Sequence, residues 1–429
     1  MQLGYGNSLI GQNRPRGAAF DVLSLSPAIW LDANQEAYVN NDPVTTATDF
    51  SGNSRDFTEA TNPPTFKTGV LNGKPGFYFD GTEQLLRSYT GTGTDFSIFL
   101  ICNRSDDSFR TLWTNSIDPY FGLNTGRRAK FYQGSSLDAS YSGLPADIDE
   151  PVVLGVISNN GTTRLLIGKN EFARGATTAS ALKVSGLSNL GGYKWVGHLF
   201  EGIATESAVS DADVINLCNY AKTKWSVPDR RILVMDGDSI TYGSGASDLA
   251  HSWAGLLATS LGRTNWHTIN TGISGQTIAD QTAGGGPAEW MSLAAATNEF
   301  TVGRRMQSSN VLIAWGGTND LFYGASAASA YAALVDYCTA AQSAGFSVIV
   351  ATMLDRTTAG GSWTRAAMQT FNASVRANWA TFADALVDPV TENSNFVDNT
   401  SGVFAEKIHP NDTGHALLSA MFSTAIASL

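Results

Sequence analysis

The sequence contains little charge, and most of that charge is negative. Only 15% of the 429 residues are charged, and 38 Asp and Glu outnumber 27 Lys and Arg, which gives a formal net charge of −11 at pH 7. Because an acidic chain repels phosphate groups and anionic lipids, we expect neither nucleic acid nor a membrane surface as a partner. The sequence also lacks an apolar run of about 18 residues, so we expect no membrane insertion.

Cysteine is scarce as well. Cys102, Cys218 and Cys338 are far apart in the sequence, and each lies in an apolar or helical segment. An odd number of cysteines without paired spacing indicates buried thiols rather than a disulfide framework. No cluster of Cys, His, Asp and Glu has the spacing of a zinc or iron site, so the sequence predicts no metal.

The first half of the chain has the pattern of a β-sandwich. Residues 24–227 contain many short apolar runs separated by Gly, Asn, Ser and Thr turns, which predicts an all-β sandwich. The segment 210–225 has helical spacing and an acidic start, so we expect one closing helix there, followed by a linker at 226–231. Residues 1–23 form an N-terminal arm, a candidate for attachment or oligomer contacts. The arm has neither the basic nor the apolar region of a secretory signal, so we expect no such signal.

The second half, residues 228–429, alternates between apolar strands and amphipathic helices. This alternation predicts a parallel sheet covered by helices on both faces. In such sheets the functional groups gather at the carboxyl ends of the strands. The predicted strands are 231–236, 266–272, 310–317, 346–354 and 385–389, and the predicted helices are 252–262, 325–345, 365–382 and 413–429.

Polar motifs follow these strands. They are GDS at 237–239, NTGISGQT at 270–277, GGTND at 316–320 and EKIHPND at 406–412. Together they offer what acyl transfer needs, namely a hydroxyl nucleophile, a histidine base, a carboxylate to orient it and donors for an oxyanion. Taken singly, each motif also fits an ordinary helix cap, a glycine turn or a solvated loop.

With the four motifs in this order, residues 231–429 resemble the SGNH hydrolases, also called the GDSL esterase family. The resemblance implies an α/β/α three-layer fold with a flavodoxin-like parallel sheet. It implies that Ser239 is the nucleophile and His409 the general base. The backbone N–H groups of Ser239 and Gly275 and the side-chain amide of Asn319 would form the oxyanion hole. It implies no metal and no cofactor.

One position departs from the family pattern. The family usually has Asp three residues before the histidine, and this chain has Glu406. We expect Glu406 to complete the triad, with Asp388 and Asp412 as lesser candidates. Asp238 and Asp320 are interpreted as structural acceptors for backbone N–H groups.

The remaining histidines and the aromatic residues near the motifs are given ordinary roles. We expect His415 to be a solvated loop residue, and His198, His251 and His267 to be packing or surface residues without partners. Three aromatic side chains near the motifs are candidates for a pocket lining or for core packing: Tyr242, Trp253 and Trp315.

A second resemblance concerns residues 24–227. The segments LSPAIWLDA (25–33), DFSGNSRDFTEA (49–60), LNGKPGFYFDG (71–81) and YAKTKW (220–225) resemble the laminin-G-like, concanavalin-type jelly rolls. Such modules often bind glycans, and they occur in phage tail and bacterial surface proteins. The aromatic residues of this half are interpreted as core rather than as a sugar platform, and they include Trp30, Phe77, Phe79 and Trp113.

Together the two resemblances predict a serine esterase that removes small acyl groups, above all acetyl, from carbohydrate. The β-sandwich would serve either as a glycan-targeting module or as a spacer. The partner would be an acylated polysaccharide or a small ester, a homo-oligomer is possible, and the setting would be extracellular or virion-associated. The alternatives are a general short-chain carboxylesterase or lipase, and a glycan-binding adhesin with a vestigial hydrolase domain. A peptidase fits the family's shallow pocket least.

Overall fold

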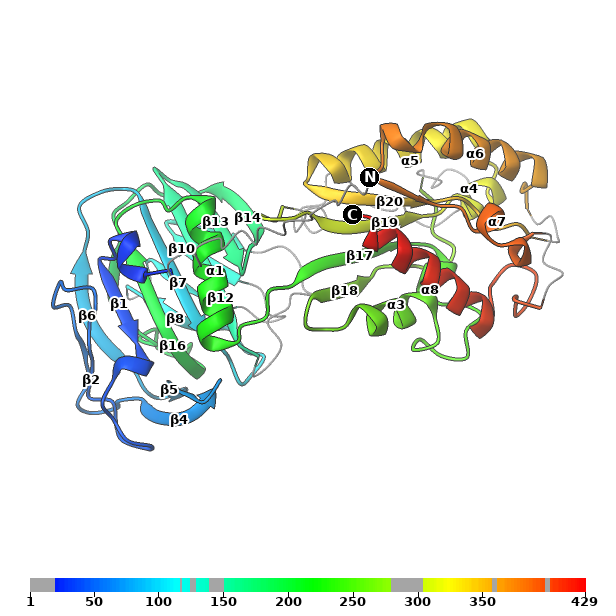
Figure 1. The fold of residues 1–429 in the computed structure, drawn as a ribbon. Coiled ribbons are helices and arrows are strands. Elements are labelled where there is room, and N and C mark those ends of the chain that lie inside the picture. The colour runs from blue at the N-terminus through cyan, green and yellow to red at the C-terminus, as the bar shows by residue number, and fades with distance from the viewer. Residues whose placement is uncertain are drawn as a thin grey trace, which may run out of the picture.

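The computed structural model describes residues 20–115, 118–123, 129–138, 150–278, 304–356, 361–397 and 402–429. It consists of a β-sandwich followed by an α/β unit (Figure 1). Most of the predicted arm, residues 1–19, lies outside the described residues. Within the described ranges, none of the helices combines the length and hydropathy needed to cross a membrane.

The sandwich is built from two antiparallel sheets. The first has the order β14-β13-β12-β7-β16-β5-β4, with β1 also paired to β16, and the second has the order β11-β10-β9-β8-β15-β6-β3-β2. The strands are β1 Ile29–Asp32, β2 Thr46–Ala47, β3 Phe57–Thr58, β4 Thr65–Leu71, β5 Lys74–Asp80, β6 Leu85–Thr90, β7 Phe96–Cys102, β8 Arg110–Thr114, β9 Tyr120–Leu123, β10 Ala129–Gln133, β11 Ser135–Asp138, β12 Val152–Asn159, β13 Thr162–Ile167, β14 Asn170–Ala176, β15 Lys183–Leu187 and β16 Val196–Thr205. The sequence prediction of an all-β first half is confirmed.

Side chains that alternate along these strands fill the space between the sheets. Phe77, Phe79 and Trp113 are fully buried there, as predicted. Trp30 is half-buried and packs in the outer layer, where its Nε1–H donates to Glu201 at 2.7 Å. The three cysteines are buried and unpaired, also as predicted.

One helix, α1 (Asp211–Trp225), covers the outer face of the first sheet. Ser210 begins it with a capping box, in which its Oγ accepts from the Asp213 N–H at 3.2 Å. The buried Glu201 of β16 fixes the end of the helix, because it accepts from Trp225 Nε1 at 2.7 Å and from Lys224 Nζ at 3.0 Å. These contacts explain why the closing helix ends in a Lys-Trp pair.

The α/β unit has one parallel sheet of order β18-β17-β19-β20-β21. Numbered along the chain this order is 2-1-3-4-5, the flavodoxin-like arrangement that the sequence predicted. Helices α3 and α8 pack in the cluster on one face of the sheet, and α5 and α6 pack on the other. The strands are β17 Arg231–Gly237, β18 Trp266–Asn270, β19 Asn310–Trp315, β20 Phe346–Ala351 and β21 Ala385–Val387. The helices are α2 Ser239–Tyr242, α3 Trp253–Leu261, α4 Thr318–Phe322, α5 Ala327–Ser343, α6 Arg365–Asn378, α7 Pro389–Glu392 and α8 Asp412–Ala427.

The sandwich joins the α/β unit at the amino ends of its strands (Figure 1). The backbone just before β19 pairs with the edge strand β14, since the Glu171 N–H donates to the Arg304 carbonyl at 3.0 Å and the Met306 N–H donates to the Lys169 carbonyl at 3.1 Å. This pairing extends a sheet of the sandwich with residues of the α/β unit and covers its edge.

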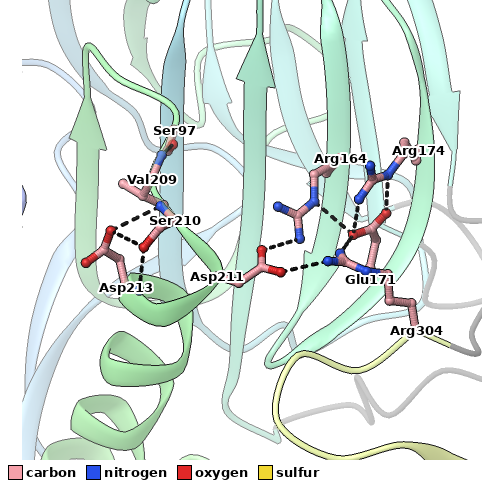
Figure 2. A network of polar contacts seen from close by, with 9 residues as sticks. All are labelled: Ser97, Arg164, Glu171, Arg174, Val209, Ser210, Asp211, Asp213 and Arg304. Carbon is pink, nitrogen blue, oxygen red and sulfur yellow. Dashed lines mark hydrogen bonds and ion pairs between the residues drawn. The ribbon is translucent and has the colours of Figure 1, made fainter. Parts of the chain in front are cut away.

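Charged side chains reinforce this junction. Figure 2 shows Arg304 between Asp211, at the start of α1, and Glu171 of β14. The Arg304–Asp211 distance is 2.7 Å. Nearby, Asp229 of the linker accepts from the buried Lys169 and from the buried Arg305, each at 2.6 Å. The two pairs of Asp229 are largely shielded from water, whereas Arg304 and Asp211 are partly exposed.

Candidate active site

The nucleophile turn lies at the carboxyl end of β17, an interior strand of the sheet. The strand is buried and ends at Gly237, and α2 begins at once with Ser239. A side chain at residue 237 would place its Cβ 2.4 Å from the Trp315 carbonyl oxygen, so only glycine allows the turn to pack this closely. Asp238 caps α2 and accepts from the Ile240 N–H at 2.9 Å. The serine is thus held at the first residue of a short helix.

His409 lies beside Ser239, although 170 residues separate them. The distance from Ser239 Oγ to His409 Nε2 is 2.8 Å. The histidine occupies a tight turn before α8, in which the Ala405 N–H donates to the His409 carbonyl at 2.9 Å. Parallel strands bring such distant turns to one edge of the sheet.

Glu406 contacts the other ring nitrogen. Its Oε1 is hydrogen-bonded to His409 Nδ1 and also accepts from the His409 backbone N–H, at 3.2 Å. A carboxylate that accepts from Nδ1–H leaves Nε2 unprotonated and able to accept the serine proton. The longer Glu side chain therefore reaches the position expected of the family's Asp.

The two lesser carboxylate candidates are bonded elsewhere. Asp388 accepts from Thr352 Oγ1 at 2.6 Å and from Arg376 Nη2 at 2.9 Å. Asp412 begins α8 and accepts from the Ser247 N–H at 2.7 Å. Among the contacts of the described residues, Glu406 is the carboxylate that meets the imidazole.

The loop after β18 links the nucleophile turn to α4. The Ile273 N–H donates to the Gly237 carbonyl at 3.0 Å, and Asn319 Nδ2 donates to the Gln276 carbonyl at 2.9 Å. Gly275 lies between these anchors with φ of 82°, a conformation that favours glycine. An amide nitrogen carries two hydrogens, so the bond to Gln276 uses one of the two. The oxyanion roles of Gly275 and Asn319 stay predictions.

Two buried carboxylates support this loop and turn. Asp320 accepts from the Ile278 N–H at 3.0 Å, and Asp238 caps α2. Burial, with a further contribution from the nearby Asp320, raises the pKa of Asp238 to about 7. Both carboxylates accept backbone N–H groups, which agrees with the structural role interpreted from the sequence.

His415 is where the sequence interpretation was wrong. It is fully buried in α8, where its Nδ1 accepts from the Trp253 N–H at 3.1 Å and its Nε2 lies 3.2 Å from the Ser244 carbonyl. Burial lowers its pKa, so the ring is neutral and donates from Nε2. The histidine thereby ties α8 and α3 to the loop that follows the nucleophile. The expectation of a solvated loop residue was also at odds with the predicted last helix, 413–429, which contains this histidine.

Gly245 is a site residue that sequence reasoning missed. A Cβ at this position would lie 2.8 Å from the His409 Cβ and 2.2 Å from the Pro410 carbonyl oxygen. The glycine therefore allows the loop after α2 to pack directly against the turn that carries the base. The available signal was the second glycine of the YGSG sequence at 242–245.

The other histidines were also wrongly expected to lack partners. His251 Nδ1 lies 2.8 Å from Asp248 Oδ1, and His198 Nδ1 lies 3.1 Å from Asn103 Oδ1. His267 likewise takes part in a polar, ring or electrostatic contact.

The aromatic residues near the motifs divide between core and surface. Trp253 and Trp315 are buried, with ring centroids 5.8 Å apart, whereas Tyr242 is 49% exposed. Tyr242 lines a cavity of about 320 Å³ between α3 and β18. Its other lining residues are Met235, Leu249, Ser252, Ala254, Gly255, Ala258, Thr268, Asn270 and Gly272. None of them is charged, so the cavity beside the nucleophile turn suits a neutral group.

Several solved structures each resemble part of this chain. A member of the lipolytic G-D-S-L family from Veillonella parvula is 20% identical and has a TM-score of 0.36, and the match covers 47% of this chain and 100% of that one. The psychrotrophic esterase EstA from a Pseudoalteromonas species is 17% identical with a TM-score of 0.33, over 46% of this chain and 97% of that one. Domain 4 of an extracellular arabinanase from Geobacillus stearothermophilus is 12% identical with a TM-score of 0.33, over 42% of this chain and 100% of that one. A comparison with curated proteins gives no match.

The family comparison covers the region that contains the serine, the loop, the amide and the histidine. Residues 237–417 match the GDSL-like Lipase/Acylhydrolase family. This segment begins at the glycine before Ser239 and ends within α8. The α/β unit therefore carries a GDSL-like lipase/acylhydrolase domain.

Proposed function

We propose that the chain is a serine ester hydrolase in which Ser239, His409 and Glu406 are the catalytic residues. The observation that carries the proposal is the hydrogen-bonded series from Ser239 Oγ through the His409 ring to Glu406, with 2.8 Å between Oγ and Nε2. A nucleophile, its base and a carboxylate that orients the base are the three parts that acyl transfer requires.

The reaction follows from these positions. His409 Nε2 takes the proton as Ser239 Oγ attacks the ester carbonyl, and the N–H groups of Ser239 and Gly275 and the Asn319 amide bind the oxyanion. The imidazolium then protonates the departing alcohol. A water molecule, deprotonated by His409, hydrolyses the acyl-enzyme and restores the serine.

For the substrate we infer a small acyl group, above all acetyl, on a carbohydrate. The motifs GDSIT-x-G and G-x-SG-x-T are most similar to the carbohydrate-esterase branch of the SGNH family. A general carboxylesterase or lipase would use the same residues, and it is the second candidate.

The β-sandwich is assigned a targeting role in this proposal. It is attached at the amino ends of the strands, away from Ser239 at the carboxyl end, so it would hold a polymer without forming the reaction site. The laminin-G-like resemblance supports this role and also an extracellular or virion-associated location. The remaining alternative is an adhesin whose hydrolase domain has lost its activity.

The test compares acetate release from acetylated polysaccharides with cleavage of short and long p-nitrophenyl esters, using wild type and Ser239→Ala. Serine-dependent release of acetate from a polysaccharide is the expected result. Serine-dependent cleavage of aryl esters alone would favour the general esterase. Activity on neither kind of substrate would favour the adhesin.

A further inference from the structure

Four aromatic side chains of the sandwich form a continuous series of ring contacts, which we call the aromatic row. It consists of Phe109, Tyr120, Tyr132 and Tyr193. The Tyr132 and Tyr120 rings stack with centroids 5.3 Å apart, Tyr120 and Phe109 meet edge to face at 5.8 Å, and Phe109 and Tyr193 meet at 4.8 Å with a tilt of 51°. None of the four was singled out by the sequence.

The row lies on the outside of the sandwich. Tyr120 pairs with Tyr132 across β9 and β10, and their neighbours Phe121 and Phe131, which are also paired, are fully buried in the core. Because side chains alternate between the two faces of a strand, the tyrosines point away from that core. Tyr193 is 46% exposed, and the other three rings are partly exposed.

We propose that the aromatic row binds a glycan chain, and this inference rests on the proposed function in carbohydrate. The C–H groups on one face of a sugar ring are weakly positive and pack against the negative face of an aromatic ring. The 51° and 62° tilts mean that Phe109 does not stack flat on Tyr193 or on Tyr120. A contiguous, partly exposed aromatic patch on the outside of a domain is typical of a binding surface.

The border of the row favours a polar occupant over an apolar protein surface. Lys130 Nζ lies 5.8 Å from the centre of the Phe109 ring. Arg110, which is next in sequence to Phe109, bonds to Asp106 at 2.9 Å and to the Lys194 carbonyl at 3.2 Å. Rings that carry hydroxyl groups and stand beside charged groups offer both stacking and hydrogen bonds, which together suit sugar hydroxyls.

The row belongs to the sandwich, whereas Ser239 follows the carboxyl end of β17 in the α/β unit. Binding at the row would therefore tether a polymer and raise its local concentration at the ester site. A soluble ester without a glycan gains nothing from such a tether. The row should accordingly lower the KM for polysaccharide and leave the hydrolysis of small esters unchanged.

The experiment measures binding in the Ser239→Ala protein by affinity electrophoresis in gels that contain acetylated xylan, acetylated glucomannan or acetylated alginate. We expect at least one polymer to retard the protein. Tyr193→Ala and Tyr132→Ala should each weaken that retardation by about three- to tenfold. Tyr193→Phe keeps the ring and should keep binding, as should Leu86→Ala, which removes another exposed apolar side chain of the same sheet.

Retardation that is absent in all three gels, or that survives loss of the rings, would overturn the inference. Light scattering adds a separate outcome, because a dimer that Tyr193→Ala dissociates would assign the row to a second copy of the chain instead. Activity assays of the row variants in the protein that keeps Ser239 distinguish this inference from the proposed function. Esterase activity with no effect of the row variants contradicts the row alone, whereas ring-dependent binding without esterase activity contradicts the proposed function alone.

Discussion

The two ends of the parallel sheet are both crowded with polar side chains, but these side chains are arranged differently. At the amino ends, Asp229 forms ion pairs with both Lys169 and Arg305 in the junction with the sandwich. At the carboxyl ends, Ser239 and His409 are partly exposed, and their hydrogen bonds form a directed series that ends at Glu406. The ion pairs at the amino ends hold the two units together. The hydrogen-bonded series at the carboxyl ends can transfer a proton from the serine to the histidine.

The comparison teaches that polarity at a strand end does not by itself identify a site. The junction has more ion pairs than the candidate active site, and the charged groups named in the junction each contact an opposite charge. The candidate site instead combines a nucleophile, a base and the loop that carries Gly275. The predictions below separate the two ends by their effects on activity and on stability.

The largest effect is expected from removing the nucleophile or its base. Ser239→Ala and His409→Ala should each lower the kcat for p-nitrophenyl acetate by about 10⁴-fold or more, because neither attack nor proton transfer remains. The melting temperature should change little, since both side chains are partly exposed. Ser247→Ala, an exposed serine near the same turn, is the control and should keep full activity. Equal activity of Ser239→Ala and wild type would refute the assignment.

The next largest effect is expected from removing the side-chain amide of Asn319, the predicted oxyanion donor. Asn319→Ala should lower kcat by about 10²–10³-fold with a smaller change in KM, because a transition-state donor is lost. Steady-state kinetics beside thermal unfolding measure this. If the variant loses only stability, through its 2.9 Å bond to the Gln276 carbonyl, Asn319 is a structural tether and not an oxyanion donor.

Glu406 should matter less than the serine or the histidine. Glu406→Gln removes the charge that stabilises the imidazolium, and we expect a loss about a hundredfold smaller than that of Ser239→Ala. Glu406→Asp should retain more activity than Glu406→Gln. The matched control is Asp412→Asn, because an amide oxygen can still accept from the Ser247 N–H. A greater loss in Asp412→Asn than in Glu406→Gln would reverse the assignment of the third residue.

At the amino ends of the strands, deleting a charge should lower the stability of the fold and leave ester hydrolysis unchanged. Asp229→Ala leaves the buried Lys169 and Arg305 without their shared carboxylate, and breaking such a pair costs about 3–5 kcal/mol. Denaturant unfolding should show the loss, while kcat for a small ester stays within about twofold. A large fall in kcat of the folded variant would mean that the junction controls the site.

The smallest effect concerns Asp238 and depends on pH. Burial raises the pKa of Asp238 to about 7 in the folded protein from its ordinary value of 3.8. The folded state therefore holds this proton more tightly than the unfolded state, so stability falls as the pH rises between these two values. Asp238→Asn carries no charge at either pH, so its melting temperature should exceed that of wild type by more at pH 8 than at pH 5. A difference in melting temperature that is the same at both pH values would contradict the raised pKa.

Much of the fold was predictable because its signals are local. Alternating apolar runs predicted the sandwich, and the strand–helix rhythm predicted the parallel sheet, whereas its flavodoxin-like order was implied by the family resemblance. Ser239 and His409 were also predictable, since they follow strands whose carboxyl ends must meet. The expectation that Glu406 would contact His409 came from the family resemblance, and the contact depends on the tight turn from Phe404 to Pro410, whose paired residues close it.

Other features depend on contacts between distant parts of the chain. The burial of His415 arises because α8 packs against α3, 162 residues earlier than the histidine. The need for glycine at 245 comes from the approach of the His409 turn. The outward direction of Tyr120 and Tyr132 follows from strand register, which the sequence left open. Short motifs therefore predicted which residues meet at the candidate site better than they predicted the contacts that support them.

The most direct test of the central claim is covalent labelling with diethyl p-nitrophenyl phosphate, followed by intact mass measurement and peptide mapping. An activated serine should react once, and we predict a single adduct at Ser239 that is absent in Ser239→Ala and forms far more slowly in His409→Ala. An adduct on another residue, or equal labelling of wild type and Ser239→Ala, would contradict the claim that this turn carries the nucleophile.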